Sequence, residues 1–186
     1  SAAQLGKSVE QELADLAMPK AHFETRLTPL DEPSSEGLER GEFYLSANPG
    51  EMPQQLAKIA SGGELSRIML ALKRSSPEGD GVHTLIFDEV DAGIGGEAAT
   101  AVGEKIARLA KEMQVLCVTH LPQVAAFADH HCQVVKEEKA GRTATDLLSL
   151  IGDDRVREMA RMLGGAQVTE RTLEHARELL SQSVIS

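Results

Sequence analysis

The stretch from Ile59 to Leu72 constrains the fold most, because it predicts a helix whose first turn carries almost no side chains. Ser61 is a favourable N-cap residue, and Glu64 is spaced to bond back to the Ser61 N–H and complete a capping box. Gly62 and Gly63 leave the helix start bare, and free N–H groups at the positive end of a helix dipole suit a phosphate. An ordinary capped helix is the alternative. The apolar stripe that follows has helical spacing: Leu65, Ile68, Met69 and Leu72.

Two later apolar runs, Thr84–Glu89 and Val115–His120, each end in polar residues. Such runs are typical of buried parallel strands, and ligands of open α/β sheets bind at the carboxyl ends of the strands. Asp88 and Glu89 point to opposite sides if the strand continues through them, but both can approach one ligand if the chain turns there. A solvated strand end is the alternative for this acidic pair, and a buried core histidine is the alternative for His120.

Together these segments resemble the C-terminal half of the ATP-binding-cassette (ABC) ATPases, and the resemblance covers nearly the whole chain. Ser61–Glu64 is similar to the signature motif, Leu85–Glu89 to the Walker B strand with its catalytic glutamate, and His120 to the switch histidine. Phe87–Asp91 is closer to the chromosome-maintenance (SMC) and DNA-repair branch than to transporters, which usually have Pro-Thr after the glutamate.

The resemblance implies an α/β fold, the C-terminal lobe of an ABC-type P-loop ATPase head, with a mostly parallel sheet flanked by helices. It assigns residues 1–18 to the end of a coiled-coil arm and residues 19–186 to the head lobe, which also carries β-hairpins. The sequence pattern alone leaves the first segment open between a surface helix and a coiled coil. Its apolar stripe is short: Leu5, Val9, Leu13 and Leu16.

The same resemblance implies an ATPase that uses ATP and Mg²⁺ and acts in repair of DNA double-strand breaks. Asp88 would hold Mg²⁺ through water, Glu89 would polarise the attacking water, and His120 would bond to the γ-phosphate or that water. The signature residues would bind, in trans, the γ-phosphate held by a second head: Ser61, Gly62, Gly63 and Glu64. ATP would thereby join two heads into a homodimer, and hydrolysis would release it.

Two departures from the family pattern stand out. No Gly-x-x-x-x-Gly-Lys-Ser/Thr stretch is present, so we expect the chain to need the missing Walker A lobe of its own protein for catalysis. Gly95 stands where many ABC ATPases carry an aspartate after Walker B. Ala60 replaces the usual leucine before the signature serine, which we treat as neutral. The first residue is Ser1 rather than methionine, which favours a fragment or a processed chain.

The composition limits which partners this segment is expected to bind. The formal net charge of −10 argues against a broad DNA-binding face on this segment, so DNA is expected to bind the assembled protein. No run is apolar and long enough to span a membrane, and Cys117 and Cys132 do not suggest a disulfide scaffold, so a reducing cytosol fits the sequence. The resemblance implies a cytoplasmic, nucleoid-associated bacterial protein. Contiguous His130, His131 and Cys132 have poor spacing for zinc.

Two other functions fit the sequence less well than a repair ATPase. A transporter's nucleotide-binding domain fits less well because Val90 and Asp91 follow Glu89. A dimerisation module without catalysis fits less well because Asp88, Glu89 and His120 are intact. Three basic residues of the signature helix are expected on a solvated face: Arg67, Lys73 and Arg74.

The remaining segments predict ordinary elements. Residues 21–27 and 41–46 alternate in polarity, which predicts an antiparallel pair joined by a polar loop over 31–39. Residues 133–138 and 143–148 predict a second hairpin across 139–142. Helices are expected over 97–112, 122–129, 156–163 and from a cap at Thr169 to about residue 181, with a flexible loop at 75–81.

Overall fold

The computed structural model describes residues 2–35, 37–59, 61–76, 81–139, 142–165 and 167–184. They form two compact units, Ser1–Val118 and Thr119–Ser186. Ala60, the residues 77–80 of the expected flexible loop and the hairpin turn at 140–141 lie outside the described residues. None of the described helices is long and apolar enough to cross a membrane.

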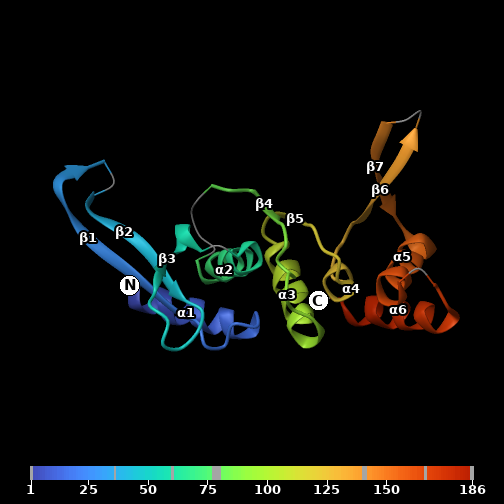
Figure 1. The fold of residues 1–186 in the computed structure, drawn as a ribbon, viewed down its shortest axis with the longest axis horizontal. Helices are drawn as coiled ribbons and strands as arrows, with labels where there is room; N and C mark the ends of the chain where they lie inside the picture. The colour runs from blue at the N-terminus through green and yellow to red at the C-terminus, as the bar shows by residue number, and fades with distance from the viewer. Residues whose placement is uncertain are drawn as a thin grey trace. The chain divides into compact units, whose positions relative to one another are not determined.

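The first unit begins with helix α1, Ala2–Asp15, as its apolar stripe predicted. The helix buries Gly6, Val9 and Leu13 and packs against α2 and strand β1 (Figure 1). The elements that follow α1 are β1 (His22–Ser34), β2 (Gly37–Ser46), the two-residue strand β3 (Gln54–Gln55) and the 3₁₀ turn η1 (Leu56–Lys58).

Strands β1 and β2 form a longer hairpin than the sequence predicted. The expected pairing of 21–27 with 41–46 is confirmed, with His22 opposite Ser46 and Leu27 opposite Gly41. The expected polar loop over 31–39 is wrong, because the ladder continues to Ser34 opposite Gly37 after an irregularity. Both faces of this outer ladder are solvated, so no buried face imposes the alternation by which a strand is recognised in a sequence.

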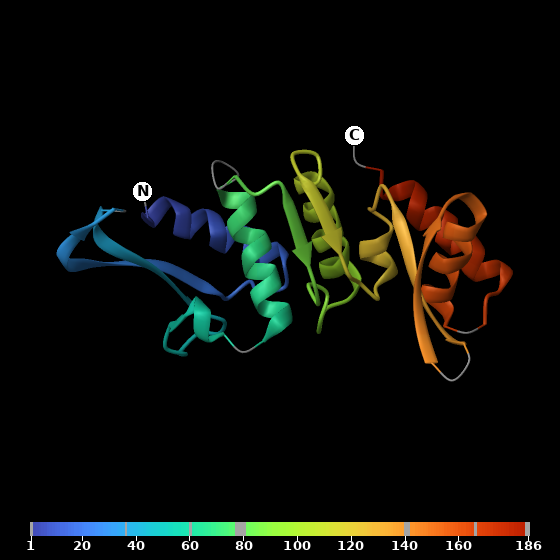
Figure 2. The same ribbon diagram turned by 90° about the horizontal axis from the view of Figure 1, so that it is seen from above.

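The centre of the first unit is a helix–strand–helix–strand succession. Helix α2 spans Gly62–Ser75, strand β4 Thr84–Phe87, helix α3 Gly96–Leu109 and strand β5 Gln114–Cys117. Strands β4 and β5 pair in parallel, with Phe87 opposite Cys117, and α3 makes the crossover between them (Figure 2). Helix α3 buries three of its expected inward residues: Val102, Ile106 and Leu109.

Parallel pairing is limited, within the described part of the chain, to β4 and β5, whereas the mostly parallel sheet expected from the sequence had more strands. The other two sheets are antiparallel. One face of the β4–β5 pair is bare: Ile86 is 70% exposed, Leu116 50% and Val118 62%. Parallel strands are normally covered on both faces, so the apolar runs predicted burial that the described residues of this chain do not supply on this face.

The buried face of α2 also differs from the expected stripe. Ile68 is buried as expected, but Met69 is 40% exposed, and Leu70 is fully buried in its place. Arg67 is buried as well, at 7% exposure, so the solvated face expected for it is wrong. The reason is that α2 packs on two sides, against α1 and against the segment after β4, so its buried surface is wider than one stripe.

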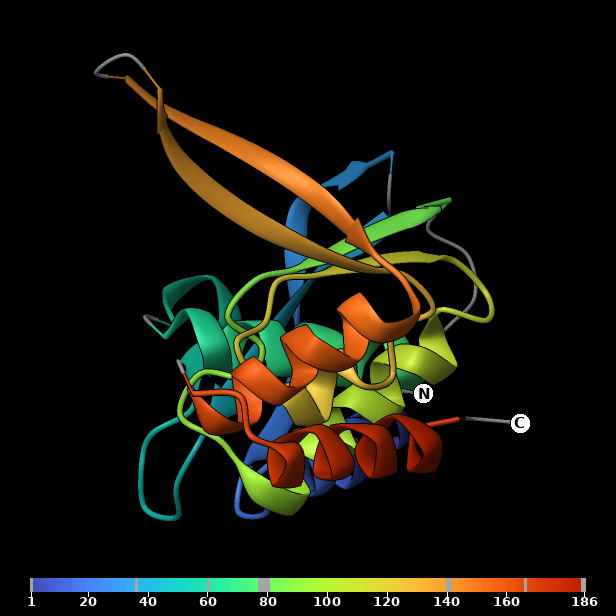
Figure 3. The same cartoon turned by 90° about the vertical axis from the view of Figure 1, so that its right-hand side faces the viewer.

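The second unit comprises α4 (Pro122–Ala125), the hairpin β6 (His131–Lys139) and β7 (Arg142–Leu150), α5 (Gly152–Gly164) and α6 (Glu170–Gln182). Helices α5 and α6 lie side by side and the hairpin extends away from them (Figure 3). The expected pairing of 133–138 with 143–148 is confirmed. The core of this unit is made of small side chains and one methionine: Ala125, Ala126, Met159, Ala160 and Ala176.

Two helix ends of the second unit are those that the sequence indicated, the start of α6 and the end of α5. Thr169 caps α6 with a reciprocal pair of bonds to Thr172. Helix α5 stops at Gly164, and Gly165 follows with a left-handed φ of 72°, a conformation that favours glycine. Helix α5 starts at Gly152, four residues before the expected start at Val156, because its polar first turn, with Asp153, carries no apolar periodicity to reveal it.

Candidate functional site

The site is built from the start of α2 and the turn that follows β4. Ser61 has extended backbone angles and its Oγ accepts a hydrogen bond from the Glu64 N–H at 3.4 Å, which is the N-cap half of the expected box. Ser61 and Gly62 are exposed. The helix behind them runs for 14 residues, so its first N–H groups and its dipole both favour an anion at this end.

The chain turns immediately after β4, as the two-carboxylate hypothesis required. Strand β4 ends at Phe87, and Glu89 has a left-handed φ of 56°, which is uncommon for a residue with a side chain. The Glu89 carbonyl accepts a hydrogen bond from the Ala92 N–H at 2.9 Å, which closes the turn. We name residues 88–92 the acidic turn. The Asp88 and Glu89 side chains are exposed.

The helix start and the acidic turn are in close contact within the same chain. A Cβ added to Gly62 would lie 2.7 Å from Glu89 Oε2. A Cβ added to Gly63 would lie 2.8 Å from Ala92 Cβ and 2.9 Å from the Glu89 carbonyl oxygen. Gly63 is therefore needed for the approach of α2 to the turn, whereas a side chain at Gly62 would meet only the movable end of Glu89, and the sequence did not predict this packing.

Two further residues of α2 bind the acidic turn and were missed by the sequence analysis. Ser66 Oγ donates to the Asp88 carbonyl at 2.7 Å. Arg67 Nη1 donates to the Ala92 carbonyl at 2.9 Å and to the Val90 carbonyl at 3.4 Å. Burial lowers the pKa of Arg67, and the Glu64 charge partly opposes this. The signal was available, because Arg67 lies four residues after Gly63 and so on the same helix face.

The carboxyl ends of β4 and β5 lie in a negative electrostatic environment. Burial, together with the negative charges of Asp91 and Asp88, raises the pKa of the Cys117 thiol to about 12. Asp91 is 2% exposed.

Across the described ranges, no three His, Cys, Asp or Glu side chains form a metal cage. One or two carboxylates fit Mg²⁺ that is bound mainly by phosphate and water, and Asp88 is exposed at this end.

His120 lies in the second unit, three residues after the end of β5, and is exposed. The backbone that precedes it is tied to the first unit's sheet, because the Val118 N–H donates to the Phe87 carbonyl at 2.9 Å. Its role at the phosphate stays a prediction. Nearby Thr119 Oγ1 accepts a hydrogen bond from the Leu121 N–H at 3.0 Å, which shapes the turn into α4.

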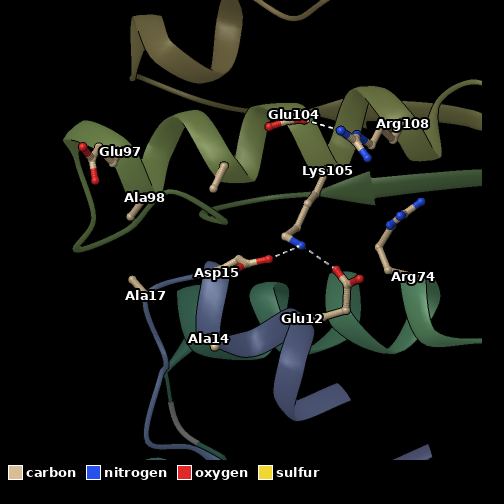
Figure 4. Close-up of a pocket in the computed structure, with 11 residues that line it drawn as sticks. Glu12, Ala14, Asp15, Ala17, Arg74, Glu97, Ala98, Glu104, Lys105 and Arg108 are labelled. Carbon is tan, nitrogen blue, oxygen red and sulfur yellow. Dashed lines mark hydrogen bonds and ion pairs between the residues drawn. The ribbon is translucent and has the colours of Figure 1, made fainter. Parts of the chain in front are cut away.

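A second feature of the first unit is a polar pocket of about 550 Å³ bordered by α1, α3 and the end of α2 (Figure 4). Lys105 Nζ bonds to Glu12 Oε2 at 2.7 Å and to Asp15 Oδ2 at 2.9 Å. Burial lowers the pKa of Lys105, but the hydrogen bonds and charges of these carboxylates outweigh it and leave the pKa raised. This cluster of Lys105, Glu12 and Asp15, which we name the α1–α3 latch, joins two helices through one ammonium and two carboxylate groups.

The chain is similar in sequence to curated DNA repair proteins named RecN. It is 48% identical over 183 residues to the RecN of Halalkalibacterium halodurans, and the aligned region covers 96% of this chain and 32% of the relative. It is 51% identical over 169 residues to the RecN of Deinococcus radiodurans, covering 91% and 29%, and 46% identical over 180 residues to that of Vibrio cholerae, covering 96% and 32%. The chain thus spans about a third of the length of these relatives. No protein-family model matches it.

Solved structures give the fold. The Smc head domain with a coiled coil and joint from Pyrococcus yayanosii superposes with a TM-score of 0.54 at 19% identity, over 97% of this chain and 29% of that one. A structure from work on ATP-driven dimerization and DNA-stimulated activation of SMC ATPases gives 0.51 at 18% identity, over 89% and 94%. The expected α/β fold, that of the Smc head domain, is therefore confirmed, and the chain is similar in sequence to a segment that makes up about a third of the curated RecN proteins.

Proposed function

We propose that this chain is the part of an SMC-like ATPase head that carries the signature helix and the catalytic carboxylates, and that it acts in repair and recombination of broken DNA. The observation that carries the proposal is the bare start of α2 packed against the acidic turn. An anion-binding helix end beside two exposed carboxylates is an arrangement suited to phosphate chemistry.

Each residue has a distinct role in this proposal. The first-turn N–H groups of α2, with Ser61, Gly62, Gly63 and Glu64, bind the γ-phosphate of ATP held by a second head. Glu89 accepts the proton of the attacking water in its own head, and His120 donates a hydrogen bond to the phosphate or orients the water. Asp88 would hold Mg²⁺ through water, and the ion would neutralise charge that develops on the phosphates.

The phosphate-binding lobe of the same protein is the partner that the proposal requires first. The chain contains no Walker A stretch, and its RecN relatives are about three times as long. The bare apolar face of β4 and β5, with Ile86, Leu116 and Val118, is the surface on which we place that lobe. Burying it fits the rule that parallel strands are covered on both faces.

The larger assembly follows from the same roles. Two heads would bind ATP between them as a homodimer. DNA would bind the assembled protein rather than the acidic surface of this segment. Residues 1–18 would continue into a coiled-coil arm. We place the protein in the bacterial cytoplasm at the nucleoid. Residues 19–186 would then form the lobe itself, which the two compact units subdivide.

The test is Glu89→Gln in a full-length RecN that carries this chain as its matching third. The amide keeps the shape of the side chain but accepts no proton, so ATP hydrolysis should fall by roughly 100-fold or more while ATP binding is retained. ATP-dependent dimers, followed by light scattering, should last longer. Glu112→Gln makes the same change at an exposed glutamate just after α3 and should leave turnover unchanged. Hydrolysis that persists in Glu89→Gln would refute the assignment of Glu89 as the base.

A further inference from the structure

We propose that Ser66 and Arg67 are positioning residues that hold the acidic turn, and through it Glu89, in the geometry needed for hydrolysis. The two side chains project from α2 beyond the residues that meet phosphate, and neither touches the reacting atoms in this account. They act on backbone carbonyls of the turn. This inference rests on the proposed function, because it assumes that Glu89 is the base.

The bonds cover the turn from end to end. Ser66 Oγ donates to the Asp88 carbonyl at 2.7 Å, directly before Glu89. Arg67 Nη1 donates to the Ala92 carbonyl at 2.9 Å, directly after the bond that closes the turn. Glu89 lies between these anchors with its left-handed φ of 56°. A residue with a side chain keeps this conformation only when its surroundings enforce it, and the two α2 side chains supply that constraint.

The burial of Arg67 supports a specific role rather than a general structural one. Arg67 is buried, with 7% of the residue exposed, and its Nε has no hydrogen-bond partner among the described residues. The pKa of Arg67 is lowered by burial, yet arginine stays charged at any pH at which the protein is folded. An apolar residue of similar length would fill the space without this desolvation, so the retained charge points to its two carbonyl partners.

The arrangement also links two nucleotides. In the proposed sandwich, the start of α2 meets the ATP of the second head, whereas Glu89 acts on the ATP of its own head. Ser66 and Arg67 join these two elements one turn beyond Gly63, so that α2 and the acidic turn move together. We infer that arrival of the second head's γ-phosphate at α2 sets the position of Glu89 in the first head.

The experiment compares four variants of full-length RecN carrying this segment. Arg67→Met removes every donor and keeps the length, Arg67→Lys restores a cationic donor that reaches fewer carbonyls, and Ser66→Ala removes the other anchor. Arg157→Met is the control, because it makes the same substitution at an α5 residue whose side chain is 71% exposed. The readouts are kcat, the Kd of ATP for isolated monomers, and the melting temperature.

Arg67→Met should lower kcat by roughly tenfold to 100-fold, because small displacements of a catalytic group have effects of that size. The Kd of ATP should stay within about twofold, and Arg67→Lys should recover part of the lost turnover. Ser66→Ala, which leaves a folded helix, should lower kcat by roughly threefold to tenfold. Arg157→Met should match the unsubstituted protein.

Two results would overturn the inference. One is turnover within about twofold of the unsubstituted protein in both Arg67→Met and Ser66→Ala, while Glu89→Gln is inactive. The other is a loss of ATP binding and melting temperature that accompanies the loss of kcat in both variants, since this is the signature of a structural role. Failure of the proposed function itself would be distinguishable, because hydrolysis would then not depend on Glu89 at all.

Discussion

Replacing Gly63 by alanine should destabilise the first unit, because the new methyl group has no space. It would lie 2.8 Å from Ala92 Cβ and 2.9 Å from the Glu89 carbonyl oxygen, both inside the distances that real Cβ atoms keep. The backbone oxygen belongs to the closed turn and cannot swing aside. Overpacking of this kind costs about 1–3 kcal/mol, which corresponds to a fall in melting temperature of roughly 2–12 °C for a chain of this size.

Gly62→Ala is the matched comparison, since it makes the same change one residue earlier. Its methyl group would meet only the Glu89 carboxylate, at 2.7 Å from Oε2, and this flexible end of the side chain can move away. Alanine also favours a helix over glycine by up to about 1 kcal/mol, a gain that applies to both glycines but that the backbone clash opposes at Gly63. The stability of Gly62→Ala should therefore equal or slightly exceed that of the unsubstituted chain, but in full-length RecN its turnover should fall because Glu89 is displaced.

The assay is thermal and urea unfolding of the 186-residue chain, followed by circular dichroism. Hydrogen exchange of the α2 amides reports whether the change is local to this helix. If Gly63→Ala is as stable as the unsubstituted chain, or if Gly62→Ala loses as much stability as Gly63→Ala, then α2 does not pack on the acidic turn as described.

Two further predictions concern the thiols and the α1–α3 latch. Iodoacetamide at pH 8 should label exposed Cys132 and spare Cys117. The reason is that a pKa of about 12 leaves only roughly 10⁻⁴ of the Cys117 side chain as the reactive thiolate at this pH. Equal labelling rates of the two cysteines by mass spectrometry would refute this prediction. Lys105→Met should lower stability by about 1–2 kcal/mol at pH 8, whereas Lys7→Met on the exposed face of α1 should not. Because the pKa of Lys105 is raised in the folded state, the latch contributes fully below the ordinary lysine pKa and is lost as pH rises through the folded value. The gap in melting temperature between the unsubstituted chain and Lys105→Met should therefore narrow by pH 11, and a constant gap would show that the charge is not responsible.

Local signals in the sequence predicted most elements of the fold. Ser61 and Thr169 were identified as helix caps because their hydroxyls satisfy first-turn N–H groups, and both caps are present. The hairpin of β6 and β7 followed from alternation, and its register is the expected one. The ladder beyond Pro29 could not be predicted, since a strand with two solvated faces has no apolar period.

The sequence indicated which residues belong to the candidate site, but not how these residues pack against one another. The resemblance indicated Ser61 and Glu89 as parts of the chemistry, and the structure puts their segments in contact. The binding of Ser66 and Arg67 to the acidic turn depends on which faces of α2 are covered, and this is a tertiary property that a stripe of apolar residues does not report. A buried arginine breaks the usual rule that charged side chains are solvated.

The central claim is that the start of α2 acts on ATP held by another head, and Ser61→Arg tests it most directly. The long side chain fills the space at the helix start, while loss of the N-cap costs only about 1 kcal/mol. Ser76→Arg makes the same change at the exposed C-terminal end of the same helix and serves as the control.

The measurement, made in full-length RecN carrying this segment, is ATP binding by isolated monomers together with ATP-dependent dimerisation by light scattering. We predict that Ser61→Arg binds ATP as the unsubstituted protein does and forms no dimer, whereas Ser76→Arg does both. Loss of ATP binding by Ser61→Arg monomers that remain folded would show that α2 acts on the nucleotide of its own head, and would contradict the account.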